Sequence, residues 1–194
     1  MNLWKVGFFL LAGSILAGII YIIVMIGGVA DSEALPKAKE IPSTASVLTV
    51  QSTKKDLEGI ANSFIYRAME EDMDIQLAVE DEIILSSELI VFSYRLPVKM
   101  HFNPVVLDDG NLMLKQSSLE LGQLNLPPST VLKVLKDSSK LPPWMIVRPK
   151  EEEIFIDLDD LPISGDLKVR AKEVNLKEDE IILEIVIPEN MGGK

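Results

Sequence analysis

The chain has 194 residues, with 19 Lys and Arg, 30 Asp and Glu, one His and no Cys. Without cysteine it has no disulfide framework, thiol nucleophile or Cys-based zinc site. The net charge of −11 argues against a nucleic-acid binder, because such proteins neutralise phosphates with Lys and Arg. The first 30 residues carry only one charge, that of Lys5. This distribution predicts one apolar anchor followed by one acidic domain.

Residues 6–29 form a run of 24 residues without a charge. As a helix this run rises roughly 36 Å, enough to cross the hydrocarbon core of a bilayer with some tilt. A cleaved signal peptide is the alternative, although its apolar region is usually about 7–15 residues long. We therefore predict a retained transmembrane anchor in residues 1–30. Lys5 before the run, with Asp31 and Glu33 after it, predicts a cytoplasmic amino terminus and a C-terminal domain outside the cytoplasm.

A stalk and a helix are expected next. Residues 31–50 mix Pro, Ser, Ala and charge without a period, which is typical of a linker, so the extracytoplasmic domain is expected over 51–194. Apolar residues recur every three or four positions over 53–69, which predicts an amphipathic helix. Thr53 and Asp56 have the spacing of a capping box at its start.

The period then changes to two, which predicts strands. Every even position over 90–102 is apolar, which indicates a long bent strand or a pair of strands, with Pro97 restricted to an edge or a bulge. Shorter alternations follow at 112–114, 154–158, 167–171 and 181–187. The alternation changes phase over 114–119 and again over 171–174, which predicts a β-bulge at each place.

One further helix is expected between the strands. Ser129 can cap a short helix after a Pro-Pro pair, and the pair Pro142-Pro143 ends it. The predicted fold class is therefore α+β: an N-terminal transmembrane helix, then a mostly antiparallel, curved β-sheet domain with one long helix and one inserted short helix.

A short internal repeat is present, because residues 80–85 and 178–183 share the sequence EDEIIL. Each copy follows an apolar strand and opens another, so the acidic residues form a solvated turn. Either an ancient duplication or the repeated use of similar hairpins accounts for the match, and we favour the hairpins because the match is short.

The inventory of reactive residues predicts no catalytic, metal or cofactor site. There is no nucleophile elbow, phosphate-binding loop or metal-ligand spacing. His101 falls on the polar side of its strand, where we expect it to face solvent. Residues 151–153, with Asp157, Asp159 and Asp160, are acidic but lack the glycine and the ligand spacing of a calcium loop, so a solvated face is expected.

The apolar side of the 90–102 segment offers a candidate binding groove. Phe, Tyr and Met on a curved sheet beneath a helix can enclose an elongated apolar site. We predict that Phe92, Tyr94, Leu96 and Met100 line it, with Trp144 and Met145 at its mouth. The alternative, which the usual role of such stripes favours, is that this face is packed core under the 53–69 helix.

Three segments resemble a known family. The stretch LPPSTVLKVLKDSSKLPPWMIV, then IFIDLDDLP and the ending IILEIVIPE, together with one amino-terminal anchor, are similar to the YpmS-like family of membrane-anchored proteins of Gram-positive bacteria. The resemblance implies a bacterial protein with an extracytoplasmic domain, and it implies no functional residues. The order of elements is more distantly similar to β-folds that hold acyl chains in a groove.

The expected function is a non-enzymatic, membrane-tethered module of the bacterial cell envelope. We expect it to bind a lipid or another apolar ligand in a groove of the sheet, near the membrane and without a cofactor. The alternatives are a scaffold that docks another envelope protein, and an envelope enzyme without a recognisable motif.

Overall fold

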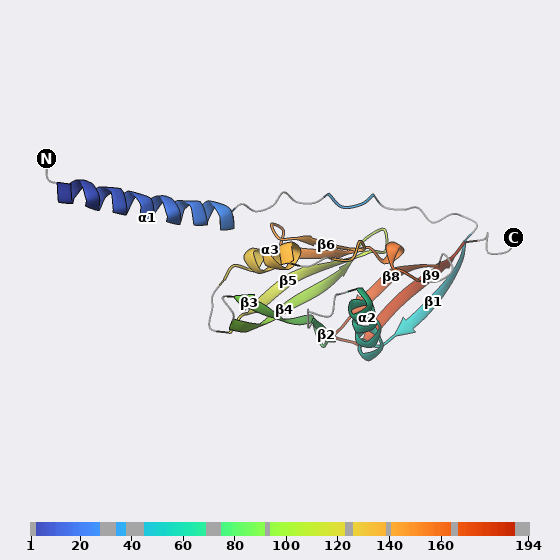
Figure 1. The fold of residues 1–194 in the computed structure, drawn as a ribbon. Helices are drawn as coiled ribbons and strands as arrows, with labels where there is room; N and C mark the ends of the chain where they lie inside the picture. The colour runs from blue at the N-terminus through green and yellow to red at the C-terminus, as the bar shows by residue number, and fades with distance from the viewer. Residues whose placement is uncertain are drawn as a thin grey trace. The chain divides into compact units, whose positions relative to one another are not determined.

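The computed structural model describes residues 3–27, 34–37, 45–68, 75–91, 94–122, 126–138, 141–163 and 167–188 (Figure 1). The chain forms two compact units, Met1–Asp31 and Ser32–Lys194. The elements in chain order are α1 (Leu3–Gly27), β1 (Ser46–Ser52), α2 (Lys54–Ala68), β2 (Gln76–Val79), β3 (Ile83–Val91), β4 (Tyr94–Val106), β5 (Leu112–Glu120), α3 (Pro128–Ser138), β6 (Met145–Arg148), β7 (Glu153–Ile156), the 3-10 helix η1 (Leu158–Asp160), β8 (Lys168–Asn175) and β9 (Glu180–Ile187).

The first unit contains the helix α1, which has 25 residues. Its side chains are described at residues 7, 8, 10–18, 20 and 21. Within the part of the chain that the structure describes, no helix is long and apolar enough to cross a membrane.

The second unit is built on two antiparallel sheets. One has six strands in the order β2-β3-β4-β5-β7-β6, and the other has three in the order β1-β9-β8. The α+β class with antiparallel strands is therefore confirmed, but the strands form two sheets where the sequence predicted one. Residues 46–50, which were expected in the stalk, belong to β1, which pairs with β9 from Ser46↔Ile187 to Ser52↔Ile181.

Both predicted bulges are present. In the β4–β5 pair His101 is opposite Ser118 but Phe102 is opposite Gln116, so Ser117 is the extra residue. The register of β8 against β9 shifts between Ala171 and Glu173. One extra residue turns the side chains that follow it to the other face of the strand. Later apolar side chains therefore point inward again, and the strand bends.

The 90–102 segment is a strand pair. β3 ends at Val91 and β4 begins at Tyr94, and β3 pairs along its whole length with residues 94–102 of β4. Pro97 lies where β4 pairs with β3 alone, since pairing with β5 begins at Lys99. The predicted restriction of Pro97 to an edge is thus confirmed.

Two helices pack on the six-stranded sheet: α2 contacts β2, and α3 contacts β5 and β6 (Figure 1). The capping box of α2 is confirmed, because the Asp56 amide donates to Thr53 Oγ1 at 3.2 Å and the Thr53 amide donates to Asp56 Oδ2 at 3.3 Å. The helix α3 begins one residue before the predicted cap, with Pro128 in its first turn, a position where the missing amide costs no hydrogen bond.

The main core lies between these helices and the sheet. It includes Val131, Leu132 and Leu135 of α3. In β4, Val98, Met100 and Phe102 are buried while Arg95, Pro97 and Lys99 are exposed, as the alternation predicted. Over residues 98–102 the apolar side of the strand is therefore packed core.

The two EDEIIL copies meet at the start of α2. Asp179, from the β8–β9 turn, accepts a 2.6 Å hydrogen bond from the backbone amide of Lys54. Asp81, from the β2–β3 turn, lies 3.5 Å from the Nζ atom of the same lysine. The two aspartates occupy the same place in the repeat. Carboxylates near a helix amino terminus are stabilising, so both turns help to fix the start of α2.

Candidate functional site

An apolar cavity of about 140 Å³ lies beneath α2, against the six-stranded sheet. Its lining comes from α2 (Leu57, Ile60, Ala61, Phe64, Ile65), β2 and β3 (Leu77, Val79, Ile83, Leu85), β4 and β5 (Phe102, Leu112, Leu114), the turn before β6 (Trp144), β6 and β7 (Met145, Ile154, Ile156) and the η1 region (Leu158, Leu161). All these side chains are apolar.

The helix that roofs the cavity is held by polar contacts to the outer strand β2. The side-chain amide of Asn62 donates to the Leu77 carbonyl at 2.7 Å, and its oxygen accepts from the Leu77 amide at 2.9 Å. Glu58 accepts a hydrogen bond from the Val79 amide at 2.9 Å. Asn62 thus pairs with the edge of β2 as a neighbouring strand would, and α2 is fixed in place without filling the space below it.

Trp144 forms one wall of the cavity. Its side chain is 6% exposed, and its ring meets Phe64 of α2 edge-on, with the ring centroids 6.4 Å apart. The backbone is also held, because the Trp144 carbonyl accepts from the Asp157 amide at 2.8 Å. Trp144 is therefore a buried wall residue where the sequence had placed it at a mouth.

The structure brings together two of the six predicted site residues. Trp144 and Met145 line the cavity. Met100 is buried in the core beside it, and Leu96 packs partly buried against the same core, and neither lines the cavity. Tyr94 begins β4, but its side chain is outside the described part of the chain. Phe92 also lies outside the described residues.

Several lining residues were not named as site residues from the sequence. Phe102 belongs to the alternating face that was recognised, and Phe64 to the recognised helix face. Leu158 ends the alternation that was recognised over 154–158. Leu161 had no such signal, because it follows a 3-10 helix of three residues that has no sustained period.

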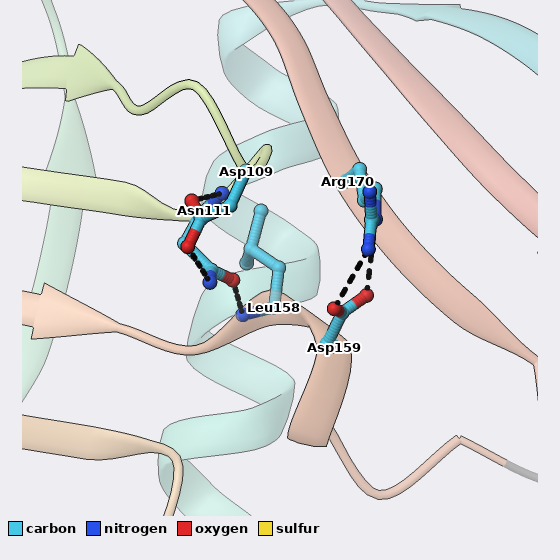
Figure 2. A network of polar contacts seen from close by, with 5 residues as sticks. All are labelled: Asp109, Asn111, Leu158, Asp159 and Arg170. Carbon is cyan, nitrogen blue, oxygen red and sulfur yellow. Dashed lines mark hydrogen bonds and ion pairs between the residues drawn. The ribbon is translucent and has the colours of Figure 1, made fainter. Parts of the chain in front are cut away.

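A polar joint beside the cavity links the two sheets (Figure 2). The Asn111 side chain accepts from the Leu158 amide at 2.9 Å and donates to Asp109 at 3.0 Å. Arg170 of β8 makes two hydrogen bonds to Asp159, at 3.3 and 3.1 Å. A bidentate arginine–carboxylate pair fixes both partners in orientation. The joint therefore holds β8 against the segment that supplies Leu158 to the cavity wall.

Gly110 makes this close approach possible. Its φ is +84°, and a Cβ atom there would lie 2.7 Å from the Cβ of Arg170. The Gly110 carbonyl accepts a 2.8 Å hydrogen bond from the Ala171 amide. The tip of the β4–β5 hairpin thus pairs with the outer side of β8.

The acidic residues of this region form the predicted solvated face only in part. Glu151 and Asp160 are exposed, whereas Glu153, Asp157 and Asp159 are buried. Glu153 pairs with Arg148, and Asp159 pairs with Arg170. Neither arginine belongs to the acidic run, so the run alone did not predict these ion pairs. Among the described residues, no group of three or more acidic or histidine side chains is placed to hold a metal ion.

His101 is also more enclosed than expected. Its side chain is 18% exposed, with Nδ1 3.2 Å from Glu82 and Nε2 3.5 Å from Glu120. The contacts lie on opposite sides of the imidazole ring and join the start of β3 to the end of β5. The arrangement is a bridge across three strands, away from the cavity lining.

Comparison with known proteins places the chain in a family. It is 27% identical over 184 residues, 93% of this chain and 95% of its relative, to the Uncharacterized protein YpmS of Bacillus subtilis (strain 168). No solved structure matches it. Residues 2–187 match the family described as Uncharacterized protein conserved in bacteria (DUF2140). The expected resemblance to YpmS-like proteins is thus confirmed, and the chain belongs to the DUF2140 family.

Proposed function

We propose that the protein is a non-enzymatic, membrane-tethered module of the bacterial cell envelope, and that it binds an apolar ligand in the cavity beneath α2. The observation that carries the proposal is the cavity itself, with its apolar lining and its volume of about 140 Å³. An unfilled apolar space costs stability, and an engineered cavity of about 150 Å³ binds benzene. A ligand that fills this space would recover the lost contacts.

Tethering is supported by the sequence, because residues 6–29 are uncharged and rise roughly 36 Å as a helix. The charge bias around it favours an amino terminus inside and residues 32–194 outside the cytoplasm. The membrane is then both the site of the anchor and a source of apolar ligands.

The lining favours binding over catalysis and over docking. A catalytic site needs convergent polar groups, and all the lining side chains here are apolar. A scaffold that docked a partner through the 141–145 loop would need that loop's aromatic residue on the surface, but Trp144 is buried.

Trp144 supplies the test, because the chain has only two tryptophans and the other is Trp4. In the full chain carrying Trp4→Phe and reconstituted in nanodiscs, fluorescence reports on the cavity wall alone. A neutral, single-chain alkylglycerol with a bromine at the chain end should quench this fluorescence saturably. Bromine quenches only at contact range, so quenching places the chain end beside Trp144.

Two variants decide whether the quenching comes from the cavity. Ala61→Leu places three extra carbon atoms in the lined space and should abolish saturable quenching. Lys55→Leu adds an apolar side chain to an exposed position of the same helix and should leave quenching unchanged. Equal quenching in both variants would show that the bromine reaches Trp144 from elsewhere, and the proposed site would fall.

A further inference from the structure

The outer strands of the two sheets differ in how their free edges are protected. The six-stranded sheet ends in β2 and β6, and the three-stranded sheet ends in β1 and β8. An open edge presents unpaired N–H and C=O groups to any other strand, so natural proteins protect their edges with charges, prolines, bulges, short strands or a covering element. In the described part of the chain, three of these four edges carry such a protection and β1 does not.

The three protected edges use different means. The edge of β2 is covered by α2, because the Asn62 side chain hydrogen-bonds both backbone groups of Leu77. In β8 four of the eight residues are charged, the register shifts after Ala171, and the amide of this residue donates to the Gly110 carbonyl at 2.8 Å. β6 has only four residues and packs against α3.

The edge of β1 is longer and has none of these features. Its sequence SVLTVQS contains no charge and no proline, and its pairing with β9 runs from Ser46 to Ser52 without a register shift. All its residues except Ser52 are exposed, and they include Val47, Leu48 and Val50. Among the described residues its only strand partner is β9, and β1 forms the outer side of the three-stranded sheet (Figure 1). The other edge of β1 is therefore open to a further strand.

The sequence of β1 is nearly symmetric about Thr49. The pairs about this centre are Leu48 with Val50, Val47 with Gln51, and Ser46 with Ser52. The first and the last of these pairs are alike in chemistry. When a two-fold axis relates two copies, residue i of one lies opposite residue j of the other, and j lies opposite i. A strand that is symmetric about its centre is therefore suited to antiparallel pairing with a second copy of itself.

The register centred on Thr49 also gives the longest pairing. It pairs all seven residues of β1, whereas a centre moved by one residue leaves two of them opposite residues outside the strand. Within each copy Leu48 pairs with Ile185 and Val50 with Leu183. Because the register places Leu48 of each copy opposite Val50 of the other, these apolar rows continue from one sheet into the next. Thr49 meets Thr49, and opposed threonines can hydrogen-bond to each other.

The distribution of charge favours a second copy at this edge. The net charge of −11 makes two copies repel each other over most of their surfaces. Residues 41–53 are an uncharged run of 13 residues that includes all of β1. Two acidic domains can therefore approach through this edge without placing like charges opposite each other in the paired strands.

We infer that two copies of the protein pair through β1, antiparallel and centred on Thr49, into one sheet with the order β8-β9-β1-β1-β9-β8. The amino ends of the two β1 strands then lie about 20 Å apart, at about 3.4 Å per residue. Residues 28–45 of each copy can span this distance, so both copies can be anchored in one membrane. No residue of β1 lines the cavity, so the pairing does not depend on the proposed ligand.

Disulfide trapping tests the register, because the chain has no native cysteine. The full chain with one added cysteine is reconstituted in liposomes at a high lipid-to-protein ratio, oxidised mildly and run on a non-reducing gel. Residues directly opposite each other in antiparallel strands have Cα atoms about 4.5–5.5 Å apart, which a disulfide can bridge. Thr49→Cys should therefore give a covalent dimer.

Matched variants of the same strand serve as controls. Val47→Cys lies on the same face of β1 and is also exposed, but its two copies would be about 14 Å apart along the strands, too far for a disulfide. Gln51→Cys is equally distant from its own copy. Neither variant should cross-link alone, but a mixture of the two should, because Val47 of one copy lies opposite Gln51 of the other.

A charge at the centre of the pairing tests its strength. Energy transfer between full chains labelled at Tyr66→Cys, an exposed position of α2, measures association in the liposomes. Thr49→Glu places two carboxylates directly opposite each other and should weaken association about fivefold. Thr49→Gln has a similar size without the charge and should leave association nearly unchanged. Urea unfolding, followed through Trp144 with Trp4→Phe, checks that both variants are folded.

Three results would overturn the inference. Equal cross-linking of the cysteine variants at 47, 49 and 51 would indicate random collisions. Equal weakening by Thr49→Gln and Thr49→Glu would show that the opposed pair at the centre does not exist. A folded Thr49→Cys protein that stays monomeric would leave the open edge to an extended segment of a different protein. The quenching of Trp144 is measured separately, so the cavity proposal stands or falls independently of these results.

Discussion

The substitution Ala61→Leu tests whether the space beneath α2 is a true void. Ala61 belongs to the helix roof and contributes only a methyl group to the lining. Alanine and leucine have nearly equal helix propensities, so any change in stability comes from the space that the new side chain enters. If the space is empty, the isobutyl group gains contacts that the alanine lacks.

The expected magnitude follows from the carbon atoms that the variant adds to an apolar space of about 140 Å³. The three added carbon atoms gain about 2.4 kcal/mol at most, at about 0.8 kcal/mol per buried methylene. After the loss of side-chain rotamer freedom, we expect the free energy of unfolding to rise by about 1–2 kcal/mol.

Urea unfolding of ligand-free protein, followed through Trp144 in the Trp4→Phe background, measures this change. The midpoint should rise while the slope stays constant. Lys55→Leu, at an exposed position of the same helix, should change stability by no more than about 0.5 kcal/mol. Destabilisation by Ala61→Leu of about 1–3 kcal/mol would be the signature of overpacking, and it would show that the space is already filled.

Three further predictions concern the joint and the anchor. Arg170→Met should lower the free energy of unfolding in urea by about 3–5 kcal/mol, because it leaves the buried Asp159 carboxylate without its arginine. Adding Asp159→Asn should recover part of this loss, and additive losses would contradict the pairing. Gly110→Ala should cost more than Gly122→Ala, because both glycines have positive φ but only Gly110 faces a close neighbour; equal losses would mean that strain in φ alone matters. Protease added to intact, wall-stripped cells should digest residues 32–194, and full protection of this unit would refute the proposed topology.

Local structure was largely predictable from the sequence. The capping pair Thr53 and Asp56 and the spacing of apolar residues located α2 to within one residue at each end. The phase changes over 114–119 and 171–174 located both bulges. Each of these features depends on residues that are close in the chain, where periodicity and cap chemistry act.

The features that the sequence did not reveal depend on distant partners. β1 is a short strand whose partner β9 begins about 130 residues later, and nothing in β1 itself names that partner. Asp159 was expected to face solvent, because the acidic run does not reveal that Arg170 pairs with it. The cavity arises because Asn62 and the acidic turns hold α2 above the sheet at a distance that the helix side chains do not fill. A space left by packing has no sequence signal.

The shared attachment of α2 has a consequence for the order in which the chain can fold. Asp81 becomes available as soon as the β2–β3 hairpin forms, but Asp179 and the strand that pairs with β1 lie near the carboxyl end of the chain. The first strand of the domain must therefore wait for the last one, and such long-range pairing is slow because loop closure precedes any gain in contacts. During that interval Val50 and Leu48 lack the β9 neighbours that later partly cover them. Closure of the three-stranded sheet thus depends on residues 180–187, and a chain released before residue 180 has no means of closing it.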